Sequence, residues 1–120
     1  MNRTVIAAVD DMFFASKIRA TAEHLGVEVR FARNAEALIA SAQENKPALI
    51  IVDLQSQKIN ATALAKVLKR DERLTDIPLL GFYSHVLKEL QQEAKDAGYT
   101  HVMPRSVFAN KLPEILSGQI

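Results

Sequence analysis

The stretch Leu49-Ile50-Ile51-Val52-Asp53 decides the fold, because four consecutive apolar residues end on an acid. Pro47 precedes this run, and the polar residues 55–58 follow it. A short apolar run between such breaks is typical of a strand buried on both faces. Asp53 then lies where a central strand leaves the core, which is the usual ligand edge of an open α/β sheet. An acid at that position either caps a turn or belongs to a site.

Four further segments have strand character, and helical patterns separate them. Strands are predicted at 4–9, 27–31, 77–82 and 100–103. Apolar residues between the strands recur at three- and four-residue steps, which predicts amphipathic helices. These helices are expected at 12–25, from a cap at Asn34 to just before Pro47, from a cap at Asn60 or Thr62 to about Arg73, from Ser84 or His85 to Gly98, and after Asn110. Such alternation predicts a parallel sheet covered on both faces by five helices.

Length and composition restrict the class of protein. The 120 residues suffice for one domain with its own core, so a single domain over 1–120 with no output domain is expected. The absence of cysteine excludes disulfide and thiolate chemistry. A net charge of +1 gives no electrostatic reason to expect nucleic acid or a membrane as partner. The apolar start of the chain is too short for a signal peptide or a membrane span, so a cytoplasmic location is expected.

A second strand also ends on acids, at Asp10 and Asp11. If the first and third strands are neighbours, these two residues and Asp53 meet at one crevice. Two unit charges about 4 Å apart repel by roughly 4 kcal/mol at an effective dielectric constant of 20, so the cluster needs a counter-charge or a proton. A divalent cation, a shared proton or a basic side chain would serve. Among cations, Mg²⁺ suits oxygen ligands that leave coordination positions open.

Four stretches, in their order and spacing, resemble the receiver domain of two-component response regulators. They are Ala8-Val9-Asp10-Asp11, the segment 46–54, Asp76-Ile77-Pro78-Leu79-Leu80, and Asp96-Ala97-Gly98. The resemblance implies a flavodoxin-like three-layer α/β sandwich with a five-stranded parallel sheet in the order 2-1-3-4-5 and five helices. It also implies that Asp53 is the phosphoacceptor. By the same resemblance Asp10, Asp11, Asp53 and the backbone of Gln55 would hold Mg²⁺.

The chain departs from the receiver pattern at the residues that transmit the signal. Tyr83 followed by Ser84 stands where the family has a threonine or serine that binds the phosphoryl group. Arg105 replaces a lysine, and its fork could bind Asp53 through two nitrogens. Val102 stands in place of the switch aromatic. Asp53, Arg105, Tyr83 and Ser84 are therefore the candidate residues for phosphoryl chemistry.

Three functions are compatible with these residues. In the first, a histidine kinase or phosphotransfer protein phosphorylates Asp53, with Mg²⁺ held by Asp10 and Asp11. The receiver, expected as a monomer or weak dimer, then acts on a downstream protein. In the second, the chain is a pseudo-receiver that binds a partner independently of phosphorylation, and Arg105 neutralises its acidic crevice. The third, a small Mg²⁺-dependent hydrolase, is disfavoured because Asp53-Leu54-Gln55 lacks the paired acids of haloacid-dehalogenase phosphatases.

Other conspicuous residues have simpler explanations. The basic side chains at Lys66, Lys69, Arg70 and Arg73 are expected on a solvated helix face, with docking of an acidic partner as the alternative. The three histidines lack zinc-ligand spacing. Core packing is expected for Phe14, and exposure near the strand ends for Phe13, Tyr83, Tyr99 and His101.

Overall fold

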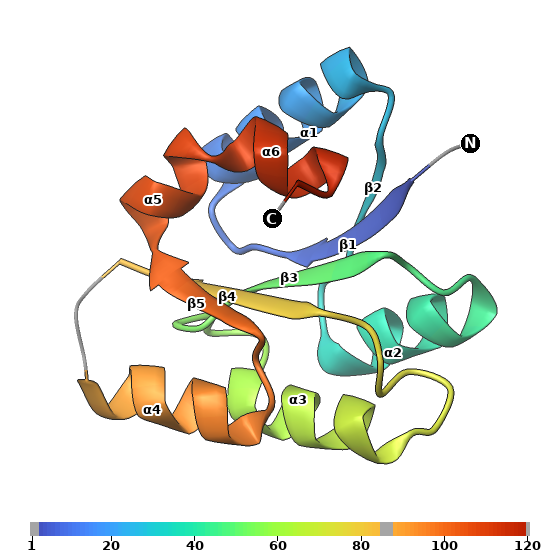
Figure 1. The fold of residues 1–120 in the computed structure, drawn as a ribbon, viewed down its shortest axis with the longest axis vertical. Helices are drawn as coiled ribbons and strands as arrows, with labels where there is room; N and C mark the ends of the chain where they lie inside the picture. Colours follow the sequence, from blue (N-terminus) through green and yellow to red (C-terminus); the bar gives the residue numbers. More distant parts are fainter. Residues whose placement is uncertain (1–2, 85–87, 120) are drawn as a thin grey trace.

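The structure, a computed structural model, describes residues 3–84 and 88–119, which form a parallel sheet in the order β2-β1-β3-β4-β5. This confirms the predicted fold class and strand order. The strands are β1 Thr4–Ala8, β2 Glu28–Phe31, β3 Leu49–Asp53, β4 Leu79–Tyr83 and β5 His101–Pro104. The helices are α1 Met12–Leu25, α2 Ala35–Glu44, α3 Ala61–Arg70, α4 Lys88–Ala97, α5 Arg105–Asn110 and α6 Leu112–Ser117. Helices α1, α5 and α6 cover one face of the sheet, and α2, α3 and α4 cover the other (Figure 1).

The core consists of two layers because successive strand residues point to opposite faces of the sheet. On β3, Ile50 and Val52 pack with α2, α3 and α4, whereas Leu49 and Ile51 pack with α1, α5 and α6. All four side chains are buried. A strand that packs against a core on both faces exposes neither set of side chains to solvent, so both sets are apolar. This explains the continuous apolar run.

The predicted caps define several helix boundaries. Asn34 accepts a hydrogen bond from the Ala37 amide at 2.7 Å, and Asn60 accepts one from the Ala63 amide at 3.0 Å. Gly26 ends α1 in the left-handed region at φ 71°, where L side chains are disfavoured. Helix α3 ends at Arg70 rather than Arg73, because Asp71 adopts an extended backbone and its side chain accepts the Arg73 amide. The suggested helix start at His85 lies outside the described residues.

The segment after β5 differs from prediction, because the described residues contain six helices instead of five. The additional helix, α5, has no side-chain hydrogen bond at its N-cap, which is Pro104. Its sequence therefore lacks the polar cap from which helix starts are recognised. The buried Phe108 holds it to the sheet. Helix α6 agrees with the prediction, since it follows Asn110 and places Pro113 in its first turn.

Gly81 on β4 makes room for the residue that follows Asp53. A Cβ atom at position 81 would lie 2.5 Å from Leu54 Cδ2, closer than carbon atoms approach one another. Leu54 is buried, and its amide donates to the Phe82 carbonyl at 2.9 Å. The glycine thus lets Leu54 lie across β4, which fixes where the loop after β3 leaves the sheet.

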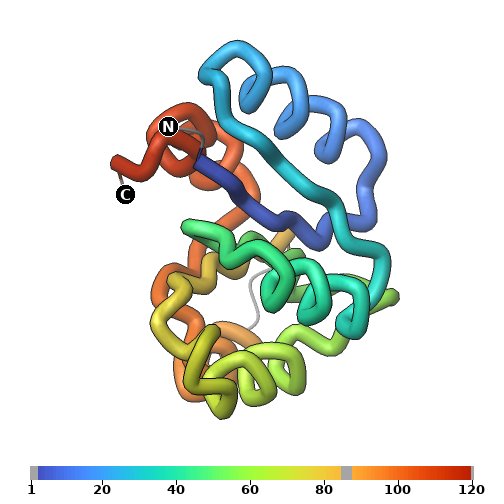
Figure 2. Tube along the Cα trace, turned by 90° about the vertical axis from the view of Figure 1, so that its right-hand side faces the viewer, coloured from blue at the N-terminus to red at the C-terminus, as the bar shows by residue number. Residues whose placement is uncertain are grey.

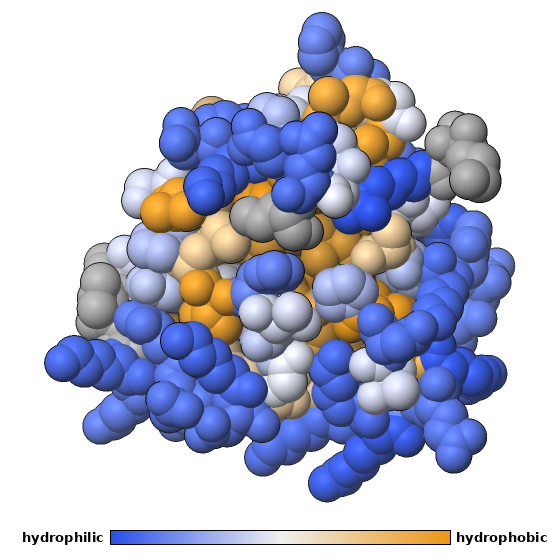
Figure 3. All heavy atoms as spheres, in the orientation of Figure 1, coloured by the Kyte–Doolittle hydropathy of each residue, from blue (hydrophilic) through white to orange (hydrophobic). Residues whose placement is uncertain are grey.

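The beginning of β1 and the end of α6 lie side by side. Figure 2 shows the blue start of β1 beside the red C-terminal helix, and Arg3 Nε donates to the Leu116 carbonyl at 2.7 Å. In Figure 3, hydrophilic side chains cover the side of the molecule where α3 and α4 lie, and apolar side chains are visible between the two helical layers. Within residues 3–84 and 88–119, every helix is too short or too polar to cross a bilayer.

Candidate functional site

The three acids follow or end neighbouring strands at one edge of the sheet. β1 and β3 pair in parallel with Ala8 opposite Val52, so Asp53 ends β3 at the same edge where Asp10 and Asp11 follow β1. The negative charges of Asp10 and Asp11 both raise the pKa of Asp53. The strand adjacency that the resemblance implied therefore places the three acids at one edge of the sheet.

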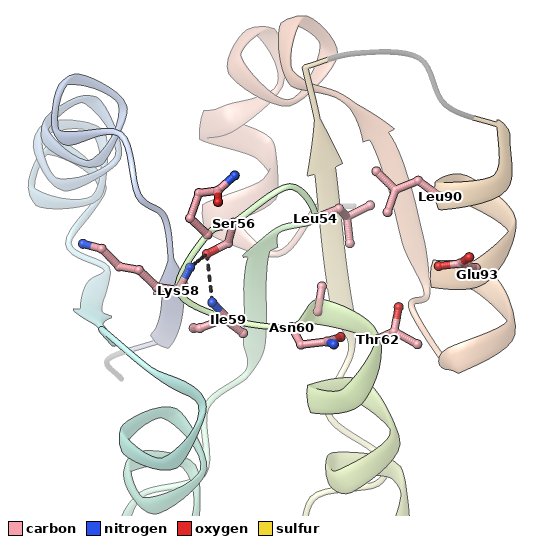
Figure 4. A pocket seen from close by; sticks show the side chains of 10 residues that line it. Leu54, Ser56, Lys58, Ile59, Asn60, Thr62, Leu90 and Glu93 are labelled. Atoms are coloured by element: carbon pink, nitrogen blue, oxygen red, sulfur yellow. Dashed lines mark hydrogen bonds between the residues drawn. The ribbon is translucent and has the colours of Figure 1, made fainter.

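Asp10 accepts two hydrogen bonds from the loop between β3 and α3. Its Oδ1 accepts from the Ser56 hydroxyl at 2.8 Å, and its Oδ2 accepts from the Gln57 amide at 2.8 Å. Ser56 Oγ in turn accepts from the amides of Lys58 and Ile59, both at 3.1 Å (Figure 4). Sequence reasoning missed Ser56, although a serine that accepts amides two and three residues ahead is a common turn-forming residue.

Asp11 accepts three hydrogen bonds, two on one carboxylate oxygen and one on the other. Oδ1 caps α1 by accepting the amides of Phe13 at 2.8 Å and Phe14 at 3.1 Å. Oδ2 accepts from Arg105 Nη2 at 2.6 Å. The Arg105 hydrogen bond, followed by the Phe14 amide, lowers the pKa of Asp11 below its ordinary value. Asp11 is therefore a carboxylate at neutral pH.

Arg105 is the first residue of α5 and lies over the ring of Phe14. The guanidinium carbon is 4.3 Å from the ring centroid, a cation–π contact that adds to the bond with Asp11. The expectation that Arg105 binds Asp53 through two nitrogens is not what the structure shows, because the guanidinium bonds Asp11 instead. Arg105 begins α5, and its guanidinium bonds the residue that caps the N-terminus of α1.

Asp53 is half-buried, and its Oδ1 accepts the Gln55 amide at 2.9 Å. Burial raises the pKa of its carboxyl above the ordinary value, and the neighbouring charges of Asp10 and Asp11 act in the same direction. The Gln55 hydrogen bond and the Arg105 charge oppose that rise. Asp53 is thus an acid whose negative charge is poorly compensated, which is the environment expected of a reactive carboxylate.

The raised pKa of Asp53 predicts a pH-dependent effect on stability. Above that pKa the folded chain holds a charge that the unfolded chain would solvate better, so the charge opposes folding. We expect Asp53→Asn to raise the melting temperature at pH 7, and the gain to vanish as pH falls towards 3.8, the ordinary value, where Asp53 is itself protonated. Thermal denaturation across this pH range measures the effect.

Asp71→Asn is the matched control, because Arg73 lowers the pKa of Asp71 through a side-chain hydrogen bond. A depressed pKa means that the carboxylate favours folding above its ordinary pKa, so this variant should not gain stability at pH 7. An Asp53→Asn variant that melts at or below the wild-type temperature at pH 7 would contradict the described environment of Asp53.

The residues at the end of β4 are arranged differently from the sequence expectation. Tyr83 is buried, 7% exposed, and packs in the core layer beneath α3 and α4 rather than lying exposed at the strand end. Tyr99 is likewise buried, and its hydroxyl donates to the Ala61 carbonyl at 2.9 Å. Ser84 is exposed, and its amide donates to Gln55 Oε1 at 2.7 Å. Gln55 thus links the loop after Asp53 to the end of β4.

The donor set, as arranged, does not fit a divalent cation. The oxygens of Asp10 and Asp11 already accept hydrogen bonds from hydroxyl, amide and guanidinium donors. Among residues 3–84 and 88–119, no three side chains of His, Cys, Asp or Glu are grouped so as to hold a metal. Magnesium binding stays a prediction of the resemblance.

The basic helix face that the sequence singled out is partly engaged in local contacts. Lys69 of the basic helix face donates to the carbonyls of Thr75 and Ile77, and Arg73 pairs with Asp71, so half of that face serves local structure.

Next to the acids, Met12 is 78% and Phe13 91% exposed, as expected for Phe13. A depression of about 390 Å³ also opens between the loop after β3 and α4, with Leu54 and Leu90 facing each other across it (Figure 4).

Comparison with solved structures defines the class of this fold. The chemotaxis response regulator CheY4 of Vibrio cholerae matches with a TM-score of 0.85 at 21% identity, over 100% of both chains. The phosphorylated cyanobacterial phytochrome response regulator RcpA matches with a TM-score of 0.82 at 17% identity, over 99% of this chain and 91% of its own. The fold is therefore that of response-regulator receivers.

The chain also has sequence relatives that are named as response regulators. The polar-differentiation response regulator DivK of Brucella anthropi is 26% identical over 120 residues, covering 100% of this chain and 98% of its own. DivK of Brucella ovis shows the same identity and coverage. No protein-family model matches the chain. The chain is thus similar in sequence, over its whole length, to stand-alone response regulators, and it has the fold of their receiver domains.

Proposed function

We propose that this chain is a signalling module in which Asp53 accepts a phosphoryl group from a histidine kinase or a phosphotransfer protein. The observation that carries the proposal is the position of Asp53. It is a half-buried carboxylate at the carboxyl end of the central strand, with acids on one side and Arg105 within electrostatic reach. In the transfer, an Asp53 oxygen forms a bond to phosphorus while the bond from phosphorus to the imidazole nitrogen of the donor breaks.

The residues around Asp53 support this step in distinct ways. The Gln55 amide orients the carboxylate by donating to Oδ1. The loop that carries Gln55 is itself held by the bonds from Ser56 and Gln57 to Asp10. Arg105 contributes positive charge, since it opposes the rise in the pKa of Asp53. A fixed cation beside the acceptor lowers the repulsion between the carboxylate and an incoming phosphoryl group.

A second function, a phosphorylation-independent interaction module, has its own support. Tyr83 is already packed in the core, and Val102 lies against the same core layer, so the threonine and aromatic pair of typical receivers is replaced by two inward side chains. Partner binding that is equal with and without modification of Asp53 would favour this second function. A downstream protein partner is part of both proposals.

The proposed acceptor role predicts a response to beryllofluoride, a mimic of the phosphoryl group. We expect saturable shifts of the amides of 53–57 in NMR spectra of the wild type, and no such shifts in Asp53→Asn. The titration is run with and without Mg²⁺, so that a metal requirement does not hide binding. Wild-type amides that stay in place under both conditions would contradict the proposal.

A further inference from the structure

A cavity of about 310 Å³ lies at the carboxyl ends of β1 and β2. Val9 comes directly after β1, Arg33 comes just after β2, and Lys58 of the loop after β3 completes the lining. Edge strand β2 pairs in parallel with β1, with Ala7 opposite Phe31, so the two loops leave the sheet at the same edge. The carboxyl edge of an open α/β sheet is where such folds usually bind their ligands.

Three basic side chains line this cavity, namely those of Arg19, Arg33 and Lys58. Among the residues that the structure describes, none of the three forms a salt bridge. The acid in the described lining is Asp10, and both of its oxygens accept hydrogen bonds from the loop after β3. The lining therefore carries an excess of two positive charges, which favours an anionic ligand.

Local contacts hold each of these cations at the cavity. Arg19 lies over the Phe31 ring, with its guanidinium carbon 4.8 Å from the ring centroid. The Lys58 amide donates to Ser56 Oγ at 3.1 Å, and its side chain extends towards the side where α1 and β2 lie (Figure 4). Arg33 directly precedes the residue that caps α2. The three positive charges thus come from three separate elements and converge on one cavity.

The rest of the described lining is apolar apart from Ser16. It consists of Val9, Met12, Ala15, Phe31 and Ala32. Met12 is 78% exposed, so its thioether is available to a ligand without any rearrangement of the core. Methionine sulfur makes favourable contacts with aromatic rings, and a guanidinium offers a flat face on which a nucleobase stacks. A ligand that matches this cavity therefore joins a doubly negative group to an aromatic body.

We propose that the cavity binds a nucleoside monophosphate. Its phosphate carries close to two negative charges at neutral pH, which matches the excess charge of the lining. Arg33 and Lys58 bind the phosphate, whereas Met12 and Arg19 contact the base. Ligand pockets have volumes of roughly 300–1,000 Å³, and one at the lower end of that range suits a single nucleotide. The proposal goes beyond phosphoryl acceptance by Asp53 and does not depend on it.

The test is a titration with adenosine monophosphate in the absence of divalent cations, followed by NMR of the amides of 9–16, 31–33 and 58. We expect saturable shifts of these amides in the wild type. Arg33→Ala and Lys58→Ala should each bind roughly tenfold more weakly, because each loses a charge-assisted bond to the phosphate. Both side chains are exposed, so both variants should keep the wild-type fold. A wild type without saturable shifts at millimolar nucleotide would overturn the proposal.

Lys66→Ala is the matched control for Lys58→Ala. Lys66 is an exposed lysine on α3 that takes no part in the described lining, and its loss changes the net charge equally. The affinity of this variant for adenosine monophosphate should equal that of the wild type. A loss as large as that of Lys58→Ala would reduce the effect to net charge, and the cavity would no longer be needed to explain it.

Two partial ligands separate the contributions of the phosphate and the base. Ribose 5-phosphate lacks the base and should bind the wild type roughly tenfold more weakly than adenosine monophosphate. Adenosine lacks the phosphate and should bind roughly a hundredfold more weakly, because it loses the bonds to both Arg33 and Lys58. Equal binding of ribose 5-phosphate would mean that the site reads only an anion, and equal binding of adenosine would remove the role of the cations. Either result contradicts a nucleotide site.

Discussion

Replacement of Phe108 by alanine is expected to lower the free energy of unfolding by about 3–5 kcal/mol, the usual loss for a fully buried phenylalanine. Its side chain is 0% exposed. The ring stacks on Phe82 with centroids 4.9 Å apart and planes at 10°, and it contacts Phe14 as well. Because domains of this size are stable by about 5–15 kcal/mol, the variant should lose a large part of its stability. Urea unfolding, with midpoint and slope compared to wild type, measures the loss.

Phe13→Ala is the control for this experiment, since Phe13 is 91% exposed one residue before the buried Phe14. Its unfolding free energy should stay within about 0.5 kcal/mol of the wild type. Equal losses at positions 13 and 108 would mean that α5 is not packed on the sheet as described. That result would also remove the support for the ring on which Arg105 lies.

The sequence predicts most of this fold because its local signals agree with one another. The apolar run ending at Asp53 identifies the central strand, and Gly26, Asn34 and Asn60 mark helix boundaries that the structure confirms. Each of these signals acts within a few residues of its own position. Helix α5 was not predicted because it has no such local signal. It is held by Phe108, which packs against residues far away in the chain.

The site was predicted less completely, since its partners depend on tertiary structure. The resemblance placed Asp10, Asp11 and Asp53 at the ends of adjacent strands, and the parallel pairing of β1 with β3 confirms that adjacency. Arg105 bonds Asp11 rather than Asp53 because of where α5 begins. The local sequence near position 105 does not indicate that a helix begins there. The burial of Tyr83 was missed for a related reason. The side of the strand to which Tyr83 points follows from β4 continuing to that residue, one beyond the predicted end at 82.

The second large effect concerns Asp53 itself. Under the proposed function, Asp53→Asn replaces the nucleophilic carboxylate by an amide, so this variant should lose all phosphoryl uptake, whereas the surface variant Asp71→Asn should keep it. Asp71 is a suitable control because its carboxylate accepts from Arg73 and Gln43, away from the crevice. An acyl phosphate on Asp53 is also expected to be cleaved by hydroxylamine, unlike a phosphate ester on Ser56 or Ser84.

The most direct test of the central claim is the intact mass of the protein after incubation with a small acyl phosphate donor and Mg²⁺. The account predicts that wild type and Asp71→Asn gain the mass of one phosphoryl group, that hydroxylamine removes it, and that Asp53→Asn gains none. A wild-type protein whose mass does not change, or an Asp53→Asn variant that is modified equally, would contradict the assignment of Asp53 as the acceptor.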